Sequence, residues 1–194
     1  MAAGMRAAPL AVAALLFAAA AHAGTSVQEP PDDAIRDVLR EAVMESVSFT
    51  DRFEAEVWLM DMSNRLQRWL PNDVERINLL KLVHYEATRV RLPPELVLAV
   101  IDVESKFDRF AISRAGAQGL MQVMPFWLNE IGRPNDNLFN VQTNLRFGCT
   151  ILRYYLDKEK GNLTRALARY NGSLGKLDYP TLVFNALNRR WYRQ

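Results

Sequence analysis

A mainly α-helical fold is predicted for this chain of 194 residues by two features of its sequence. Apolar residues recur every three to four positions through most of the chain after residue 30, and no alternating strand pattern of useful length appears. Hydrophobic residues make up 49% and charged residues 24%, which is ordinary for a globular protein and argues against disorder. The length favours one compact domain with a small extension.

The first 23 residues have the pattern of a secretory signal peptide. Arg6 is the only early charged residue, an apolar run follows it, and Ala21-His22-Ala23 forms an Ala-x-Ala cleavage signal. The run is too short for a membrane anchor, since a bilayer span needs about 20 apolar residues. We therefore expect cleavage near Ala23/Gly24, a periplasmic or otherwise exported protein, and no stable membrane span in the mature chain.

Charge and cysteine content exclude several classes of protein. A net charge of +2 is too balanced for a dedicated DNA-binding protein, so no nucleic-acid partner is expected. One Cys and two His exclude a disulfide framework and a Cys/His zinc site, and no phosphate-binding glycine loop is present. We predict no metal ion and no cofactor. Residues 144–194 hold ten basic side chains against three acidic ones, which would suit an anionic polymer, although such runs are usually only solvated faces.

Three helices are predicted before residue 90. The first covers residues 31–48, and the second runs over Thr50–Trp69 and ends before Pro71. The third begins at Asn72, whose spacing from Glu75 is that of a capping box.

These helices suggest a division of the chain into a signal peptide at 1–23, an N-terminal helical extension at 24–78 and a main domain at 79–194. The extension has two possible roles: it packs against the main domain as a wall of its groove, or it docks onto an envelope or secretion complex. We predict packing in cis, because the third helix runs into the main domain without a flexible linker.

The helix predicted for ELVLAVIDVESKF is apolar on nearly all sides and belongs in the middle of the core. Glu104 extends the apolar stripe of Val100 and Ile101, so its carboxyl group is expected to be partly desolvated, which raises its pKa. A carboxyl group that stays protonated nearer neutrality can act as a general acid. The competing interpretation is an ordinary helix end that meets water. Asp102 points to another side of the helix and is expected to be a surface or capping group.

Three short motifs follow one another in order. They are Glu104-Ser105 with Phe107, then Ala111, Ser113 and Gly116-Ala117 with Gly119-Leu120-Met121-Gln122 and Met124-Pro125, and finally Ala166-Leu167-Ala168 with Tyr170-Asn171. Together they resemble the catalytic domain of the Slt-type (family 1) lytic transglycosylases over roughly residues 79–180. The resemblance implies a lysozyme-like helical domain and an enzyme that cleaves the glycan strands of peptidoglycan.

The resemblance also implies a mechanism. The β-1,4 bond between MurNAc and GlcNAc would be cleaved with formation of 1,6-anhydro-MurNAc ends, and Glu104 would act as general acid and then base. Glycoside cleavage usually needs two carboxylates, but one suffices when the substrate supplies the second group. In this family the N-acetyl group of the muramoyl sugar assists the leaving group, and the 6-hydroxyl of the same sugar then attacks C1.

Six further residues are assigned to the substrate site by the same resemblance. Tyr170 would hydrogen-bond the acid, and Met121 would shape an apolar floor. Polar side chains that would position N-acetyl or hydroxyl groups of the sugars are Ser113, Gln122 and Asn171. Ser105 belongs to the signature, but we expect it to be structural, hydrogen-bonded to the backbone beside the acid.

Two other functions remain open. A lysozyme that adds water is disfavoured because no second carboxylate falls in a motif. A non-catalytic peptidoglycan-binding or scaffold module of an envelope-spanning secretion apparatus is disfavoured by the intact Glu104. Its one supporting feature is Gly172-Ser173, where family members commonly have Ala-Gly. Cys149 lies in a helical segment and is expected to pack as a small hydrophobe rather than to react with His84.

Overall fold

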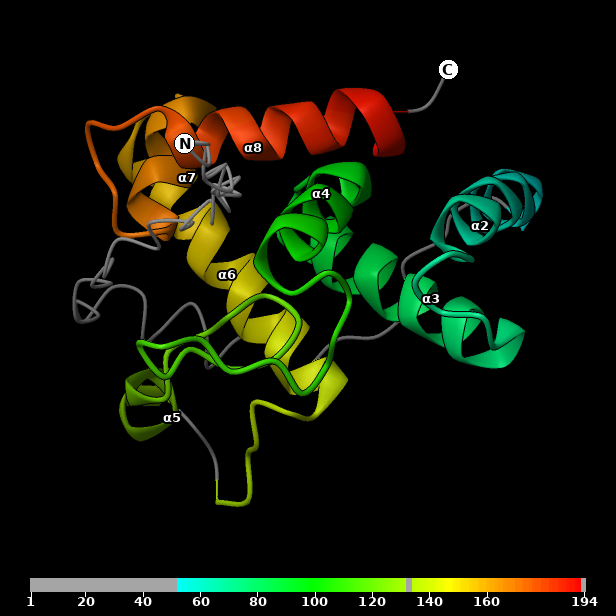
Figure 1. Cartoon of the computed structure of the whole chain (residues 1–194), viewed down its shortest axis with the longest axis horizontal. Coiled ribbons are helices and arrows are strands. Elements are labelled where there is room, and N and C mark those ends of the chain that lie inside the picture. The colour runs from blue at the N-terminus through cyan, green and yellow to red at the C-terminus, as the bar shows by residue number, and fades with distance from the viewer. Residues whose placement is uncertain (1–51, 132–133, 193–194) are drawn as a thin grey trace, which may run out of the picture.

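The computed structural model describes residues 52–131 and 134–192, and helices joined by turns and one long loop after residue 104 make up these ranges (Figure 1). The helices in this part are α2 (Arg52–Leu66), α3 (Asp73–Arg89), α4 (Pro94–Glu104), α5 (Phe126–Ile131), α6 (Val141–Lys158), α7 (Leu163–Tyr170), α8 (Asp178–Ala186) and the π-helix η1 (Leu187–Trp191). The described ranges contain two isolated β-bridges and no strand. The mainly α-helical fold is therefore confirmed. The predicted signal peptide and the helix predicted at 31–48 lie outside the described residues.

Asparagine side chains begin three of these helices. The Asn72 side chain accepts a hydrogen bond of 2.9 Å from the Glu75 backbone N–H, as the predicted cap requires. Asn140 at α6 and Asn162 at α7 cap their helices in the same way, each at 3.0 Å. The second predicted helix ends earlier than expected, because α2 stops at Leu66 and a turn follows.

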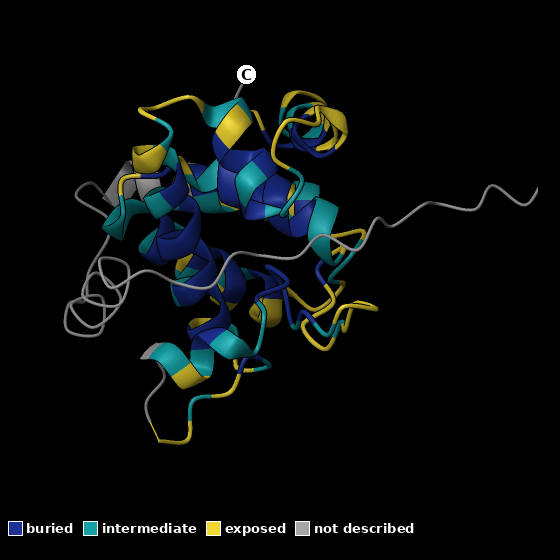
Figure 2. Ribbon diagram, turned by 90° about the vertical axis from the view of Figure 1, so that its left-hand side faces the viewer, coloured by how far each residue is buried: buried dark blue, intermediate teal, exposed yellow. Residues whose placement is uncertain are grey.

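Helix α4 lies at the centre of the core. Its residues from Leu96 to Asp102 are all buried, which agrees with the prediction from its apolar sequence. It contacts α3 on one side and the α8–η1 segment on another, while α6 packs against α3 and α7. Figure 2 shows buried residues gathered in the interior and exposed ones at the periphery. The end of α4 is therefore held by elements from both halves of the sequence.

Helix α2 packs against the start of α4 and the C-terminal end of the described chain. The Trp58 indole N–H donates a 2.8 Å hydrogen bond to Glu95, and Arg65 donates to the carbonyl oxygens of Arg190 and Tyr192 at 3.0 and 3.2 Å. The packing in cis expected of the extension holds for α2. The predicted division at residue 78 falls within α3 and stays a prediction.

Candidate active site

Glu104 is the last residue of α4 and keeps partial exposure to solvent. Protein atoms nevertheless surround its carboxyl group, and this burial raises its pKa to about 7. The Tyr179 hydroxyl donates a hydrogen bond of 2.7 Å to Glu104 Oε1, which offsets part of the rise. The partly desolvated carboxyl group predicted from the sequence is confirmed. With this pKa, Glu104 can release and take up a proton near neutral pH.

The donor to Glu104 is Tyr179 in the first turn of α8, and the resemblance had assigned this role to Tyr170. The Tyr170 hydroxyl donates to the Met121 carbonyl oxygen at 2.7 Å. Both tyrosines are buried, and burial together with the nearby Glu104 carboxylate raises the pKa of each hydroxyl well above its ordinary value. Both therefore stay neutral hydrogen-bond donors beside the acid. The role of Tyr179 could not be predicted from the sequence, because only the packing of α8 on α4 brings its hydroxyl to Glu104.

Asp102 corrects another expectation. It is not a surface or capping group, because its side chain is only 1% exposed. One carboxylate oxygen accepts hydrogen bonds from Arg190 Nε at 2.5 Å and Trp191 Nε1 at 3.1 Å, and the other accepts from Lys106 Nζ at 3.0 Å. Burial alone would raise the pKa of Asp102, but these hydrogen bonds and the charge of Lys106 hold it below its usual value.

The loop after α4 is held in place by a buried amide. Asn144 accepts a 2.8 Å hydrogen bond from the Met121 backbone N–H and donates to the carbonyl oxygens of Gln118 and Leu138 at 2.8 and 2.9 Å. Gly119 lies against this amide with φ +74°, and a Cβ there would come within 2.5 Å of the Leu138 oxygen. Only glycine fits at this close approach, which explains why the second motif needs it.

The remaining site residues predicted from the sequence lie on this loop and on the turn after α7. Ser105 donates to the Leu120 carbonyl oxygen at 2.8 Å, which agrees with the structural role expected of it. Met121 is fully buried, and the apolar floor expected of it stays a prediction. Gln122 is nearly buried and donates to the carbonyl oxygens of Ala111 and Gly119 at 3.1 and 2.9 Å.

Two further predicted residues are nearer to solvent. Ser113 is exposed, and its hydroxyl oxygen accepts a 3.0 Å hydrogen bond from the Ala117 N–H, closing a turn. Asn171 caps the C-terminal end of α7 and is half-buried. The structure thus brings Met121 and Tyr170 together near Glu104. It shows how Ser113 and Gln122 shape the loop, and their contacts with sugar stay predictions.

Cys149 is buried in α6, with its Sγ 4.0 Å from the Met121 sulfur. Burial raises the pKa of the thiol, so a thiolate is strongly disfavoured. The ring of His84 lies against Trp58, with ring centroids 5.1 Å apart. Cys149 therefore packs as a small hydrophobe, as predicted.

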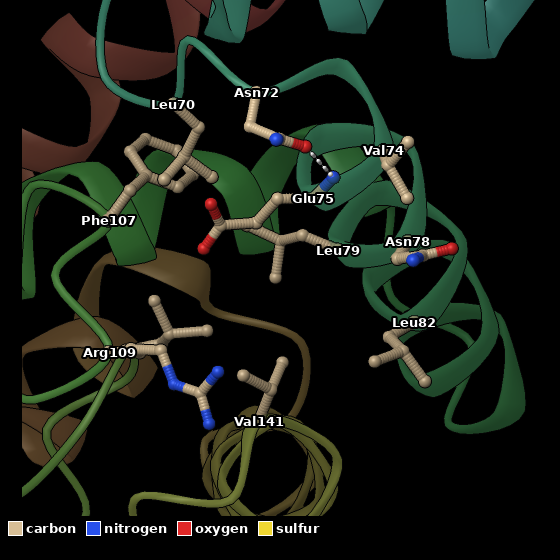
Figure 3. Close-up of a pocket in the computed structure, with 11 residues that line it drawn as sticks. Leu70, Asn72, Val74, Glu75, Asn78, Leu79, Leu82, Phe107, Arg109 and Val141 are labelled. Carbon is tan, nitrogen blue, oxygen red and sulfur yellow. Dashed lines mark hydrogen bonds between the residues drawn. The ribbon is translucent and has the colours of Figure 1, made fainter.

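A separate cavity of about 450 Å³ lies between α3 and the segment that follows α4 (Figure 3). Its walls are the side chains of Leu70, Asn72, Val74, Glu75, Asn78, Leu79, Leu82, Phe107, Arg109, Leu120 and Val141. Glu104 and its two tyrosine neighbours do not line it, so the cavity is not the site of the acid. Within residues 52–131 and 134–192 no cluster of three His, Cys, Asp or Glu residues could hold a metal ion. The helices described there are also too short or too polar to cross a bilayer.

The described helices bury the Glu104 carboxyl group beside two neutral tyrosines, and this arrangement can support acid catalysis. The chain belongs to the transglycosylase SLT domain family, whose sequence model matches residues 81–181, just over half of the chain. This membership agrees with the resemblance carried by the three motifs and with the lysozyme-like helical fold expected from it.

Similarity to individual relatives is moderate. A protein of Enterobacteria phage PRD1 named transglycosylase is 29% identical over 134 residues, which cover 66% of this chain and 45% of the phage protein. Membrane-bound lytic murein transglycosylase C of Yersinia pestis is 30% identical over 114 residues, which cover 50% of this chain and 32% of the enzyme. The chain spans less than half the length of these relatives.

Matches among solved structures include an inactive mutant of the lytic transglycosylase Slt from Pseudomonas aeruginosa. It has a TM-score of 0.42 and 26% identity, and the match covers 53% of this chain and 19% of that one. The 70 kDa soluble lytic transglycosylase from Escherichia coli has a TM-score of 0.43 and 22% identity, with 71% of this chain and 24% of that one covered.

Proposed function

We propose that this protein is a peptidoglycan lytic transglycosylase that cleaves the MurNAc–GlcNAc β-1,4 bond and leaves 1,6-anhydro-MurNAc ends. One observation carries the proposal: the Glu104 carboxyl group has a pKa of about 7 at the end of α4, where its hydrogen-bond partner is the neutral Tyr179. A group that must give a proton and then take one works best when its pKa lies near the working pH. Membership of the SLT family supports this reaction class.

In the first step of the proposed reaction, protonated Glu104 gives its proton to the glycosidic oxygen while the bond from that oxygen to C1 of MurNAc breaks. The N-acetyl group of the same sugar assists from the opposite side, and the GlcNAc part leaves with a free hydroxyl. In the second step the 6-hydroxyl oxygen attacks C1, and the Glu104 carboxylate takes the proton of that hydroxyl. The acid is regenerated and no water is consumed.

Tyr179 orients the acid in this proposal, because its hydroxyl bonds one carboxyl oxygen and leaves the other for the substrate. Ser113 and Asn171 are the proposed polar contacts to the sugars, since both retain exposure beside the loop and turn of the site. The Gln122 amide nitrogen is engaged by the loop, so its carbonyl oxygen is the group proposed to accept from a sugar hydroxyl or N–H. Met121 supports the loop from beneath, and Tyr170 fixes Met121 through its carbonyl oxygen.

The proposed substrate is the glycan of the cell wall, so the mature chain would act in the periplasm or another exported location. The predicted cleavage near Ala23/Gly24 supports this location. Association with an envelope or secretion complex is a further proposal, and the acidic composition of residues 29–56, with nine acidic side chains against three Arg, gives it a candidate contact region.

The test is digestion of purified peptidoglycan sacculi by residues 24–194, with products identified by mass spectrometry. Anhydro-muramoyl products from the wild type and none from Glu104→Gln would support both the reaction and the acid. Glu75→Gln is the matched control, because it makes the same change at an exposed glutamate of α3 that lies outside the three motifs. Products with reducing ends would instead mean a lysozyme-type hydrolase. Binding to sacculi without any product would favour a binding or scaffold module.

A further inference from the structure

Helix α8 continues directly into η1, and both pack against α4 (Figure 1). At the beginning of this continuous segment, Tyr179 donates a hydrogen bond to Glu104. At its end, Arg190 and Trp191 donate to Asp102. One helical segment therefore forms hydrogen bonds with two residues in the last turn of α4, Asp102 and Glu104.

The side chains of Asp102 and Glu104 point to opposite sides of α4. Each residue of an α-helix turns by about 100°, so side chains two positions apart, such as Asp102 and Glu104, point about 200° apart around the axis. Packing in the core already fixes α4. The two contacts on opposite sides of its last turn join the α8–η1 segment to α4 and so hold Tyr179 in place.

The Asp102 contact is built to be rigid. The Trp191 side chain is fully buried, and its ring stacks on Trp69 with centroids 5.4 Å apart and packs on Phe107 at 5.3 Å. Lys106 and Phe107 leave α4 with φ +53° and +66°, an unusual conformation for residues with side chains, which turns the chain sharply after the acid. Charge-assisted hydrogen bonds to a buried carboxylate are among the strongest in proteins.

Helix α2 adds support from outside, because Arg65 donates to the Arg190 carbonyl oxygen at 3.0 Å. Arg65, Arg190 and Trp191 all lie beyond the residues that the SLT family model matches, 81–181. Residues on both sides of the matched family domain therefore support Asp102: Arg190 and Trp191 bind it directly, and Arg65 binds the Arg190 backbone.

We propose that Asp102 is a positioning residue for the transglycosylase reaction: by binding Arg190 and Trp191 it fixes the α8–η1 segment on α4 and so keeps the Tyr179 hydroxyl in contact with Glu104. The inference rests on the proposed function and extends it to residues outside the family domain. A positioning role can be distinguished from a direct effect of the Asp102 charge, because the two predict opposite changes in the pKa of Glu104.

The charged groups that face Asp102 are Lys106 and Arg190, and the titratable groups beside Glu104 are Tyr170 and Tyr179. Replacing Asp102 by Asn removes a negative charge near Glu104, and by Coulomb's law alone this lowers the pKa of the acid. Loss of the Tyr179 hydrogen bond has the opposite effect, since that bond lowers the pKa of Glu104. A rise is therefore the signature of lost positioning.

The experiment compares the pH profile of sacculus digestion for wild type, Asp102→Asn and Trp191→Phe. Trp191→Phe keeps an aromatic ring in the cluster and removes the indole donor together with part of the ring volume. We expect the alkaline limb, where Glu104 loses its proton, to move to higher pH in both variants, with a rate about tenfold lower, as for the loss of one oriented hydrogen bond. Combining either change with Tyr179→Phe should add no further shift. An unchanged or lowered limb, or additive shifts in the double variants, would overturn the inference.

Two controls keep the result interpretable. Asp157→Asn removes an exposed carboxylate that pairs with Arg153 on α6, and it should change neither rate nor pH profile. Titration of the Glu104 carboxyl group by carbon-13 NMR measures its pKa in each folded variant without turnover. If the wild type releases no product, the proposed function fails, while this titration still decides whether Asp102 controls the contact between Tyr179 and Glu104.

Discussion

The two sides of the last turn of α4 hold two carboxyl groups in opposite states. On the Asp102 side the partners are two cations and an indole N–H, and the pKa is held below its usual value. On the Glu104 side the hydrogen-bond partner is a neutral hydroxyl, and the pKa rises to about 7. Both groups are surrounded by protein, so burial alone does not separate them. The charge of the partner decides which carboxyl group is structural and which can work as an acid.

Glu86 on α3 is a second buried glutamate, and it has a cationic partner. It is 1% exposed, and burial raises its pKa although Arg89 binds it at 2.8 Å and opposes the rise. Arg89 also donates to Thr150 of α6, so the pair joins two helices. A buried glutamate with a cationic partner therefore serves packing, whereas Glu104 lacks such a partner in the described part of the chain.

The largest effect is expected from replacing Glu104, the carboxyl group without a cationic partner among the described residues. Glu104→Gln keeps the shape of the side chain and removes its proton-transfer capacity, so turnover of sacculi should fall about 10²–10⁴-fold, the usual contribution of a general acid and base. The measurement is the initial rate of release of soluble muropeptides, with Glu75→Gln as control. A variant that kept more than about a tenth of the wild-type rate would show that another group supplies the proton.

The same substitution should change how stability depends on pH. The pKa of Glu104 is raised from 4.5 to about 7 in the folded state, so its favourable contribution is complete below about pH 4.5 and is lost as pH rises through 7. Gln does not titrate. Relative to wild type, Glu104→Gln should therefore gain up to about 3 kcal/mol of unfolding free energy between pH 4.5 and 8. Urea unfolding at both pH values measures this, and a difference that stayed constant with pH would contradict the raised pKa.

Smaller effects are expected from replacing the two tyrosines, and only one of the two substitutions should change the pKa of Glu104. Tyr179→Phe removes the hydrogen bond to Glu104, which should raise the pKa of the acid further and reduce the rate about tenfold at neutral pH. Tyr170→Phe removes the bond to the Met121 carbonyl oxygen, so it should lower stability and leave the midpoint of the alkaline limb in place. Equal shifts of that midpoint in both variants would mean that the two hydroxyls share the role.

Local features of this site could be predicted from the sequence. The desolvation of Glu104 follows from its position after Val100 and Ile101 on one helix face, and the Asn72 cap follows from its spacing to Glu75. Both depend on residues within a few positions of each other. The order of the three motifs also predicted the family to which the chain belongs.

The partners of the two carboxyl groups could not be predicted in this way. Tyr179 lies 75 positions after Glu104, and Arg190 lies 88 positions after Asp102. Their contacts exist only because α8 and η1 pack across α4, and helical periodicity says nothing about which distant helix meets which. Helical periodicity placed Asp102 away from the Glu104 stripe, and the error was to assume that this other side faced water.

The smallest expected effect tests which cation matters for Asp102. The Lys106 side chain is 63% exposed, whereas Arg190 approaches the same carboxylate from η1, which continues the helix that carries Tyr179. An ammonium group this exposed contributes about 0–1 kcal/mol, because solvent screens it and its long side chain loses entropy. Without it, Asp102 still has Arg190 and Trp191 as partners. Lys106→Met should therefore lower the free energy of unfolding by less than about 1 kcal/mol and leave the pH profile of digestion unchanged. Urea unfolding measures this loss. A larger loss would mean that the sharp turn after Glu104 depends on the Lys106 ammonium group. The loop after α4 would then hold the Asp102 carboxylate as much as η1 does.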